Sequence, residues 1–137
     1  MIPVTARVLL VDDLSLIRKM LRNCLSEMGF RTVDDAVDGA DGIAKLEAAA
    51  AAGAPYDIVF LDWNMPNKTG IEVVEYCRAS DTLKNLPIIM VTAEAEKRNV
   101  LKALMQGAND YIVKPVSVAI LTAKLENLSE QLKKKVG

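Results

Sequence analysis

Acidic, hydroxyl and basic side chains follow four short apolar runs of the sequence. Asp12 and Asp13 come directly after the first of these runs, and Asp62 follows another. Thr92 and Lys114 stand at the ends of two later runs, so the set comprises three carboxylates, a hydroxyl and an ammonium. The chain has no histidine, which excludes serine–histidine and cysteine–histidine nucleophiles, histidine-ligated zinc and a phosphohistidine of its own. Any acid–base or metal chemistry must therefore rest mainly on carboxylates, lysine, tyrosine and hydroxyl groups.

These residue types favour phosphoryl chemistry with a divalent cation. Aspartates packed together repel one another unless a cation enters between them. Oxygen ligands in small number suit Mg²⁺, which keeps several waters and leaves positions for phosphoryl oxygens. Lys114 would add positive charge, and the Thr92 hydroxyl could donate a hydrogen bond to a phosphoryl oxygen. With no histidine or activated cysteine, the natural nucleophile is a carboxylate, and we expect Asp62 to form an aspartyl phosphate.

Five short runs rich in β-branched residues predict the strands that must position these side chains. They cover residues 7–11, 31–36, 57–61, 87–92 and 110–114. Helical spacing of apolar residues between them predicts helices near 17–28, 39–52, 70–79 and 95–106, and a last helix from 118 onwards with Ser117 as its cap. Strands that alternate with helices indicate an α/β fold with a parallel sheet covered on both faces. The carboxyl ends of such strands share one edge, where we expect the chemical groups to converge.

The composition describes one soluble domain. The chain has 137 residues, 51% of them hydrophobic, and a net charge of −1, so nothing in the whole chain points to nucleic acid or a membrane. Residues 31–36 are unusually polar, which predicts an edge strand. Cys24 and Cys77 lie in apolar helical patterns, so we expect buried, reduced thiols and a cytoplasmic protein. No signal peptide and no apolar run long enough to span a membrane is visible.

Four sequence segments resemble the receiver domain of two-component response regulators, especially stand-alone chemotaxis-type receivers. They are VLLVDD (8–13), FLDWNMP (60–66), MVTAEA (90–95) and YIVKP (111–115). The resemblance extends from residue 7 to about residue 130. It implies a (βα)5 doubly wound, flavodoxin-like fold with the strand order 2-1-3-4-5. It also implies that residues 1–137 form a single receiver domain without an output domain.

The resemblance assigns roles to the acidic residues and the lysine. Asp62 matches the phospho-acceptor of the family. Asp13, Asp62 and the backbone carbonyl of Asn64 match its Mg²⁺ ligands, and Asp12 matches a residue that acts largely through water. Lys114 matches the lysine that contacts the phosphoryl group.

Further positions match residues that transmit or limit the signal. Thr92 and Tyr111 resemble the pair that couples phosphorylation to a surface change. Asn64 and Glu94 resemble the two positions that tune spontaneous dephosphorylation. In the family the bond after the lysine, here to Pro115, is cis. The implied output face comprises Val100, Leu104, Tyr111, Val113 and Lys124.

The chain departs from the family pattern near the site. Lys68 and Thr69 precede Gly70, where the family usually has a hydrophobic residue and an aspartate. Thr69 can still cap the next helix, whereas Lys68 brings an extra charge that would alter the choice of partner or donor. Val116 replaces a common phenylalanine, and Leu104 is bulkier than the usual alanine.

The function implied by the resemblance is two-component signalling. We expect Asp62 to take a phosphoryl group from the phosphohistidine of a histidine kinase, or from a small phosphodonor. We expect the domain to act as a monomer. It is not expected to be a turnover enzyme, although it assists its own phosphorylation and autodephosphorylation. The implied target is a flagellar switch protein or a phosphotransfer protein, in chemotaxis. Nucleic acid is not expected as a partner, because the run of residues 133–135 suits the end of the last helix.

Other classes of function remain open at this point. The domain could be a phosphorelay intermediate or a receiver that regulates a kinase outside chemotaxis. A haloacid-dehalogenase-type phosphatase also uses an aspartate and Mg²⁺, but it needs a second acid where this chain has Asn64, and a cap segment for which there is no room. A non-phosphorylated scaffold is disfavoured by the full set of acids, threonine and lysine.

Overall fold

Strands and helices alternate along the chain, as the two hydrophobic periods of the sequence predict. The computed structural model describes residues 2–63, 65–93 and 97–136, and it excludes the side chains of residues 97–99, 135 and 136. The strands are β1 (Arg7–Val11), β2 (Thr32–Ala36), β3 (Ile58–Asp62), β4 (Ile88–Thr92) and β5 (Asp110–Val113). The helices are α1 (Ser15–Glu27), α2 (Gly39–Ala51), α3 (Gly70–Ala79), α4 (Lys97–Gln106) and α5 (Val118–Val136). Each strand lies within one residue of its predicted bounds.

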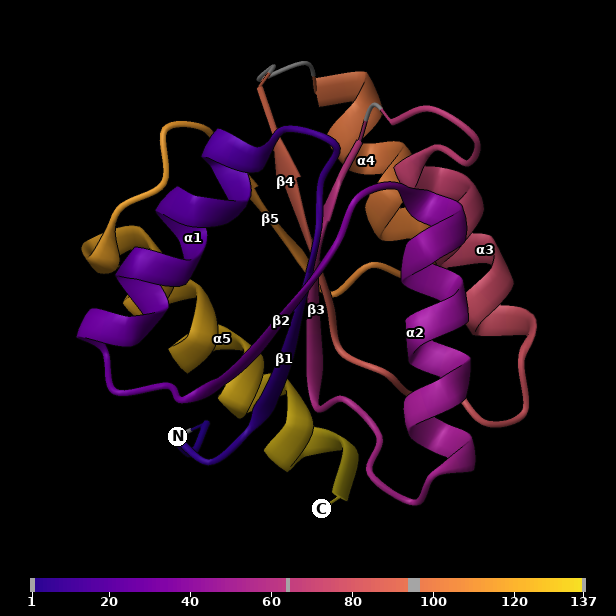
Figure 1. Ribbon diagram of the computed structural model, residues 1–137, viewed down its shortest axis with the longest axis horizontal. Helices are drawn as coiled ribbons and strands as arrows, with labels where there is room; N and C mark the ends of the chain where they lie inside the picture. The colour runs from indigo at the N-terminus through magenta and orange to yellow at the C-terminus, as the bar shows by residue number, and fades with distance from the viewer. Residues whose placement is uncertain (1, 64, 94–96, 137) are drawn as a thin grey trace.

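The strands form one parallel sheet in the order β2-β1-β3-β4-β5, which confirms the predicted fold. Helices α1 and α5 cover one face of the sheet, and α2, α3 and α4 cover the other (Figure 1). Strands β3 and β4 are buried along their whole length, as expected for central strands. The side-chain oxygen of Ser117 accepts a hydrogen bond from the Ile120 N–H at 3.2 Å, so the predicted cap of α5 is present.

Alternate residues of the central strands pack into two separate hydrophobic layers, one on each face of the sheet. Leu9 and Leu61 point to the layer beneath α2, α3 and α4, whereas Leu10 and Phe60 point to the layer beneath α1 and α5. All four side chains are almost completely buried. The two layers fix the sheet from both sides, so the strand ends are held on a rigid frame.

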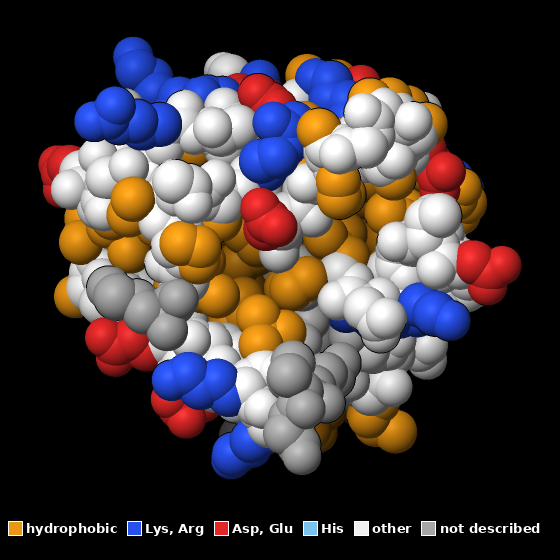
Figure 2. All heavy atoms as spheres, turned by 90° about the horizontal axis from the view of Figure 1, so that it is seen from below, with side chains coloured by type: hydrophobic (Ala, Val, Ile, Leu, Met, Phe, Trp, Pro, Cys, Tyr) orange, Lys and Arg blue, Asp and Glu red, His pale blue; other side chains and the backbone are white. Residues whose placement is uncertain are grey.

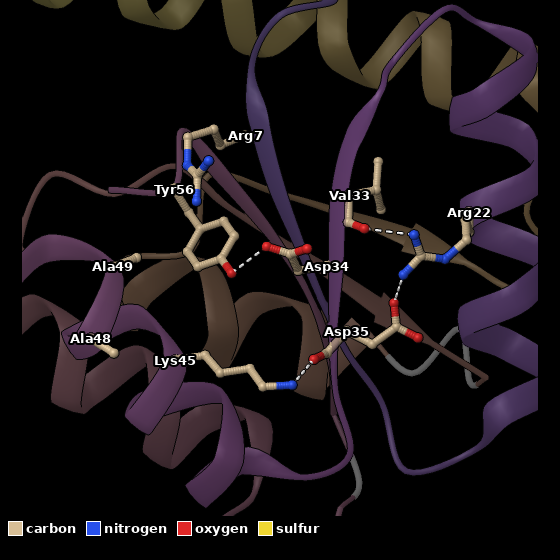
Figure 3. Close-up of a pocket in the computed structure, with 9 residues that line it drawn as sticks. All are labelled: Arg7, Arg22, Val33, Asp34, Asp35, Lys45, Ala48, Ala49 and Tyr56. Atoms are coloured by element: carbon tan, nitrogen blue, oxygen red, sulfur yellow. Dashed lines mark hydrogen bonds and ion pairs between the residues drawn. The ribbon is translucent and has the colours of Figure 1, made fainter. Parts of the chain in front are cut away.

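The polar strand β2 is the edge strand that the sequence predicts, and side chains cover its outer edge. Arg22 of α1 donates a hydrogen bond to the Val33 carbonyl and pairs with the Asp35 carboxylate, while Lys45 of α2 donates to the Asp35 carbonyl (Figure 3). Tyr56 donates to Asp34 in the same shallow pocket (Figure 3). These cations occupy backbone acceptors that another strand would need, which disfavours pairing at this edge.

The face at the amino ends of the strands has a central hollow in which hydrophobic side chains gather. Figure 2 shows this face, on which both chain ends of Figure 1 lie. A pocket here is lined mainly by apolar side chains, including those of Ile2, Leu83, Leu86 and Leu132. The hollow lies at the end of the sheet opposite to the carboxyl ends of the strands.

The two cysteines are free thiols, and the prediction that both are buried is correct only for Cys77. Cys77 is fully buried on α3, and burial raises the pKa of its thiol to about 11. Cys24 is half-buried, because it lies at the side of the apolar stripe of α1 that Leu21 and Leu25 fill. Among the described residues, no helix is long and apolar enough to cross a bilayer.

Candidate functional site

The pairing of β1 with β3 places two aspartates side by side. Val11 lies opposite Leu61 in the parallel register. Asp12 comes directly after Val11, and Asp62 comes directly after Leu61, so the two aspartates are also neighbours. Asp12 is 1% exposed and Asp62 is 7% exposed, although both are acidic. Burial of two neighbouring carboxylates is costly, which marks this edge of the sheet as a functional site.

The pairing of β4 and β5 adds the hydroxyl and the ammonium. Asp62 lies opposite Val91, so Thr92 follows next to it at the end of β4. Thr92 in turn lies opposite Val113, and Lys114 comes directly after that pair. The Lys114 N–H donates to the Thr92 carbonyl at 2.8 Å, which continues the sheet into the site. Register alone therefore aligns the ends of four strands at one edge.

Three carboxylates and one ammonium form the centre of the site. Each of Asp12, Asp13 and Asp62 offers an oxygen, and these oxygens lie within 4.8 Å of one another. The Lys114 Nζ lies 3.3 Å from Asp12 Oδ2 and 3.4 Å from Asp62 Oδ1. Asp13 is exposed, so the cluster opens to solvent on its side. The sequence prediction that these four side chains meet is confirmed.

The site carries more negative charge than Lys114 balances. Burial, and after it the neighbouring Asp12 charge, raise the pKa of Asp62 to about 6, although Lys114 and the backbone N–H of Trp63 act in the opposite direction. The set of donors consists of hard carboxylate oxygens, some buried and some open to water. This set fits Mg²⁺, which prefers a few carboxylates and retained waters and would offset the surplus charge.

The raised pKa of Asp62 shows that its negative charge is unfavourable in the folded protein. Removing this charge should therefore raise the free energy of unfolding of the metal-free protein. A carboxyl whose pKa is higher in the folded state binds more protons there, so stability falls as pH rises from about 4 through about 6. Asp62→Asn should therefore unfold at higher urea concentration at pH 7.5 in chelator, with a gain of about 3 kcal/mol in the free energy of unfolding. The gain should shrink towards pH 4, and an equal or lower stability of the variant at pH 7.5 would contradict this electrostatic account.

The loop after β1 is held by a residue that the sequence analysis missed. Arg18 of α1 donates from Nη1 to the Asp12 carbonyl at 2.6 Å, and its Nε lies 3.2 Å from Asp35 Oδ2. The Leu14 N–H donates to Asp12 Oδ1 at 2.9 Å. These contacts fix both the backbone and the carboxylate of Asp12. The available signal was an arginine in the first turns of the helix that directly follows the acidic pair.

The loop after β3 folds back against the strand end and requires glycine at position 70. The Gly70 N–H donates to the Trp63 carbonyl at 2.9 Å, and a Cβ at position 70 would lie 2.3 Å from the Asp62 carbonyl oxygen. Thr69 accepts from the Glu72 N–H while Glu72 accepts from the Thr69 N–H, which is a complete capping box. The predicted cap is therefore present, and the departure at Thr69 leaves the loop intact.

The remaining predicted residues lie at the edge of the site or outside the described residues. Asn64 and Glu94 fall outside the described residues. Tyr111 is half-buried on β5, and the Lys114–Pro115 bond is cis, as the resemblance implies. The other residues of the implied output face are at least partly exposed on α4, β5 and α5: Val100, Leu104, Val113 and Lys124.

A parallel five-stranded sheet of this order, with an acidic cluster and a lysine at its carboxyl edge, defines the class of two-component receivers. The family profile of the response regulator receiver domain matches residues 8–126. The chain therefore belongs to this family, whose members bind Mg²⁺ in general, and its function is that of a two-component response regulator. Membership of this family sets the phosphatase hypothesis aside.

The relatives with chemotaxis names are similar over nearly the whole chain. Chemotaxis protein CheY-3 of Vibrio cholerae is 38% identical over 126 residues, which are 92% of this chain and 93% of the relative. CheY of Pseudomonas aeruginosa is 36% identical over 92% of this chain and 98% of its own. Among solved structures, V. cholerae CheY4 has a TM-score of 0.77 and 34% identity, covering 89% of this chain and 97% of its own. The CheX–CheY–BeF3–Mg complex of Borrelia burgdorferi has a TM-score of 0.79 and 31% identity, covering 93% of this chain and 89% of the matched chain.

Proposed function

We propose that Asp62 is the residue that accepts the phosphoryl group, in a reaction that requires Mg²⁺. The observation that supports this assignment is the position of Asp62 among Asp12, Asp13 and Lys114. Its carboxylate ends a central strand and contacts the ammonium, whereas Asp13 is exposed at the rim. Asp62 is therefore the carboxylate whose surroundings best match those of an activated nucleophile.

The transfer itself needs little beyond positioning and charge. A carboxylate oxygen of Asp62 forms a bond to phosphorus, and the bond from phosphorus to the imidazole nitrogen of the donor breaks. The departing imidazole keeps the electron pair and takes a proton from solvent. Lys114 neutralises charge on the phosphoryl oxygens, and the Thr92 hydroxyl donates a hydrogen bond to one of them. Mg²⁺ would be held by Asp13, Asp62 and the Asn64 carbonyl, with Asp12 acting through water. The bound ion would supply the positive charge that lets a phosphoryl group approach three carboxylates.

The phosphorylated domain signals through its own α4-β5-α5 face. Attraction between Thr92 and the phosphoryl group draws Thr92 towards Asp62, and the Tyr111 ring moves inward into the space behind it. Tyr111 is half-buried on β5, an outer strand of the sheet, so its side chain is not fully enclosed by the core. On α4, Leu101 is 57% exposed and Met105 is 84% exposed, so this face offers apolar contacts to a partner.

The partners follow from the family and from the chemotaxis names of the relatives. The donor is the phosphohistidine of a histidine kinase, or a small phosphodonor. The target is a flagellar switch protein or a phosphotransfer protein in the cytoplasm. The covered edge of β2 supports a monomer. Asn64 and Glu94 set the rate at which the aspartyl phosphate hydrolyses, so the domain limits its own signal without turning over a substrate.

Acetyl phosphate tests the proposed function without knowledge of the kinase. The protein, incubated with Mg²⁺ and acetyl phosphate, should gain the mass of one phosphoryl group in intact mass spectrometry. A chelator should prevent the gain, because the carboxylates would then face the phosphoryl dianion without a compensating ion. An adduct that forms equally well in chelator would contradict the metal-dependent reaction, and no adduct under either condition would contradict the function.

The tryptophan next to Asp62 should report metal binding. Trp63 is half-buried, and its backbone N–H donates to Asp62 Oδ1 at 2.9 Å, so a cation bound at Asp62 changes the surroundings of the neighbouring indole. Mg²⁺ should change the intrinsic fluorescence along a saturable curve. Asp13→Ala should weaken the apparent affinity by about tenfold or more, since it removes a proposed direct ligand. A response that is flat, or that is identical in the variant, would count against the metal site as assigned.

A further inference from the structure

Lys124 of α5 links the first two residues of β5. Its Nζ lies 2.9 Å from Asp110 Oδ1 and 4.5 Å from the centre of the Tyr111 ring. The ammonium is thus in salt-bridge contact with one residue and in cation–π contact with the next. Lys124 was expected only as part of the output face, and these contacts place it directly against the residue proposed to switch.

The ammonium is held in place because Asp110 is itself fixed. Asp110 is only 7% exposed. Its carboxylate accepts hydrogen bonds from three donors: the Lys124 ammonium, the Asn127 side-chain amide at 2.8 Å and the Tyr111 backbone N–H at 2.8 Å. A carboxylate with three donors has little freedom to turn. The salt bridge therefore anchors the Lys124 ammonium, and its charge is held near the Tyr111 ring.

In this structure the half-buried Tyr111 ring lies 4.5 Å from the Lys124 ammonium, and we assign this arrangement to the outer position of the ring. When Tyr111 moves inward, its ring leaves the ammonium, whereas the bond between Lys124 and Asp110 can remain. The contact thus stabilises the inactive arrangement and is lost in the active one, which is the differential interaction that a two-state switch requires. We propose that Lys124 is a positioning residue that holds Tyr111 in its outer position and so sets how readily the domain activates. This inference rests on the proposed function.

The expected size of the effect follows from the strength of the contact. Cation–π contacts at partly exposed sites shift an equilibrium by about two- to fivefold. A ligand that binds the active state has an apparent affinity proportional to the active fraction. When the active state is the minor one, removing the contact should tighten such a ligand by the same factor of about two to five.

Beryllofluoride, a mimic of the phosphoryl group, can measure this shift in the full chain. Lys124→Gln keeps a hydrogen-bond donor for Asp110 but removes the charge from the ring. With Mg²⁺ present and Trp63 fluorescence as the signal, this variant should bind beryllofluoride about two- to fivefold more tightly than the native protein. Lys124→Arg keeps a cation and should bind like the native protein. Thermal melting of each variant checks that the fold is retained.

Two controls separate a hold on Tyr111 from a general effect of charge. Lys133→Gln removes another lysine from α5, one whose exposed partner is Glu130, and should leave the affinity unchanged. In a Tyr111→Leu background, Lys124→Gln should also have no effect, because the ring is absent. Unchanged or weaker binding by Lys124→Gln in the native background, or equal tightening in the Tyr111→Leu background, would overturn the role of Lys124. If the native protein fails to bind beryllofluoride at all, the proposed function fails and this inference fails with it.

Discussion

Replacing Asp62 with asparagine is expected to abolish the phosphoryl adduct formed with Mg²⁺ and acetyl phosphate. Asparagine has nearly the same shape, but its amide is not a nucleophile towards phosphorus and does not carry the charge that attracts the metal. Intact mass spectrometry should show only the unmodified mass at times when the native protein is largely phosphorylated. The loss should be complete, because Asp12 follows β1, which β3 separates from the strand that ends in Thr92, and Asp13 lies exposed at the rim of the site.

A matched aspartate away from the site distinguishes chemistry from a general loss of charge. Asp81 is exposed in the segment between α3 and β4, which leads to the amino end of β4, whereas the site lies at the carboxyl ends of the strands. Asp81→Asn should accept the phosphoryl group like the native protein. If Asp62→Asn still gains a phosphoryl group while it remains folded, the acceptor is another residue and the assignment of the site is wrong.

Replacing Thr92 with alanine is expected to separate phosphorylation from its output. The variant keeps Asp62, the acidic pair and Lys114, so Asp62 should still accept the phosphoryl group. The variant lacks the hydroxyl that donates a hydrogen bond to a phosphoryl oxygen. Without this bond Thr92 is not drawn towards Asp62, and the space into which Tyr111 moves does not open. Most of the surface change around Val100, Tyr111 and Val113 should disappear.

Amide NMR with beryllofluoride can follow both halves of this prediction. In the native protein, shifts should appear near Asp62 and also between residues 100 and 113. In Thr92→Ala, the shifts near Asp62 should remain, and those between residues 100 and 113 should be strongly reduced. Equal shifts over residues 100–113 in both proteins would show that Thr92 does not carry the signal and that Tyr111 is only a half-buried residue of an outer strand.

The fold could be predicted because its signals are local and strong. Apolar runs such as VLLV, IVFL and IIMV give the strands, and the polar run before Ala36 gives the edge strand. The meeting of Asp12, Asp62 and Lys114 also followed from sequence, because groups that end parallel strands must share one edge. Register then brings them within contact distance, which no property of the individual residues requires.

Long-range contacts of basic side chains could not be predicted in the same way. Arg18 and Lys124 look like ordinary exposed helix residues, and only the packing of α1 and α5 against the sheet brings them to Asp12 and Tyr111. Arg78 is a similar case, since its guanidinium donates to the Gly107 and Leu86 carbonyls from another part of the chain. Such contacts depend on where a long side chain ends, which hydrophobic periodicity does not encode.

The most direct test of the central claim is to find the phosphorylated atom by chemical trapping. An aspartyl phosphate is reduced by borohydride to homoserine, so the acceptor keeps a permanent mark after the phosphoryl group has gone. The protein should be phosphorylated with acetyl phosphate and Mg²⁺, reduced, digested and sequenced by mass spectrometry. The account predicts homoserine at position 62 and none in a sample prepared with chelator. Homoserine at position 12 or 13, or phosphate on a hydroxyl such as Thr92, would contradict it.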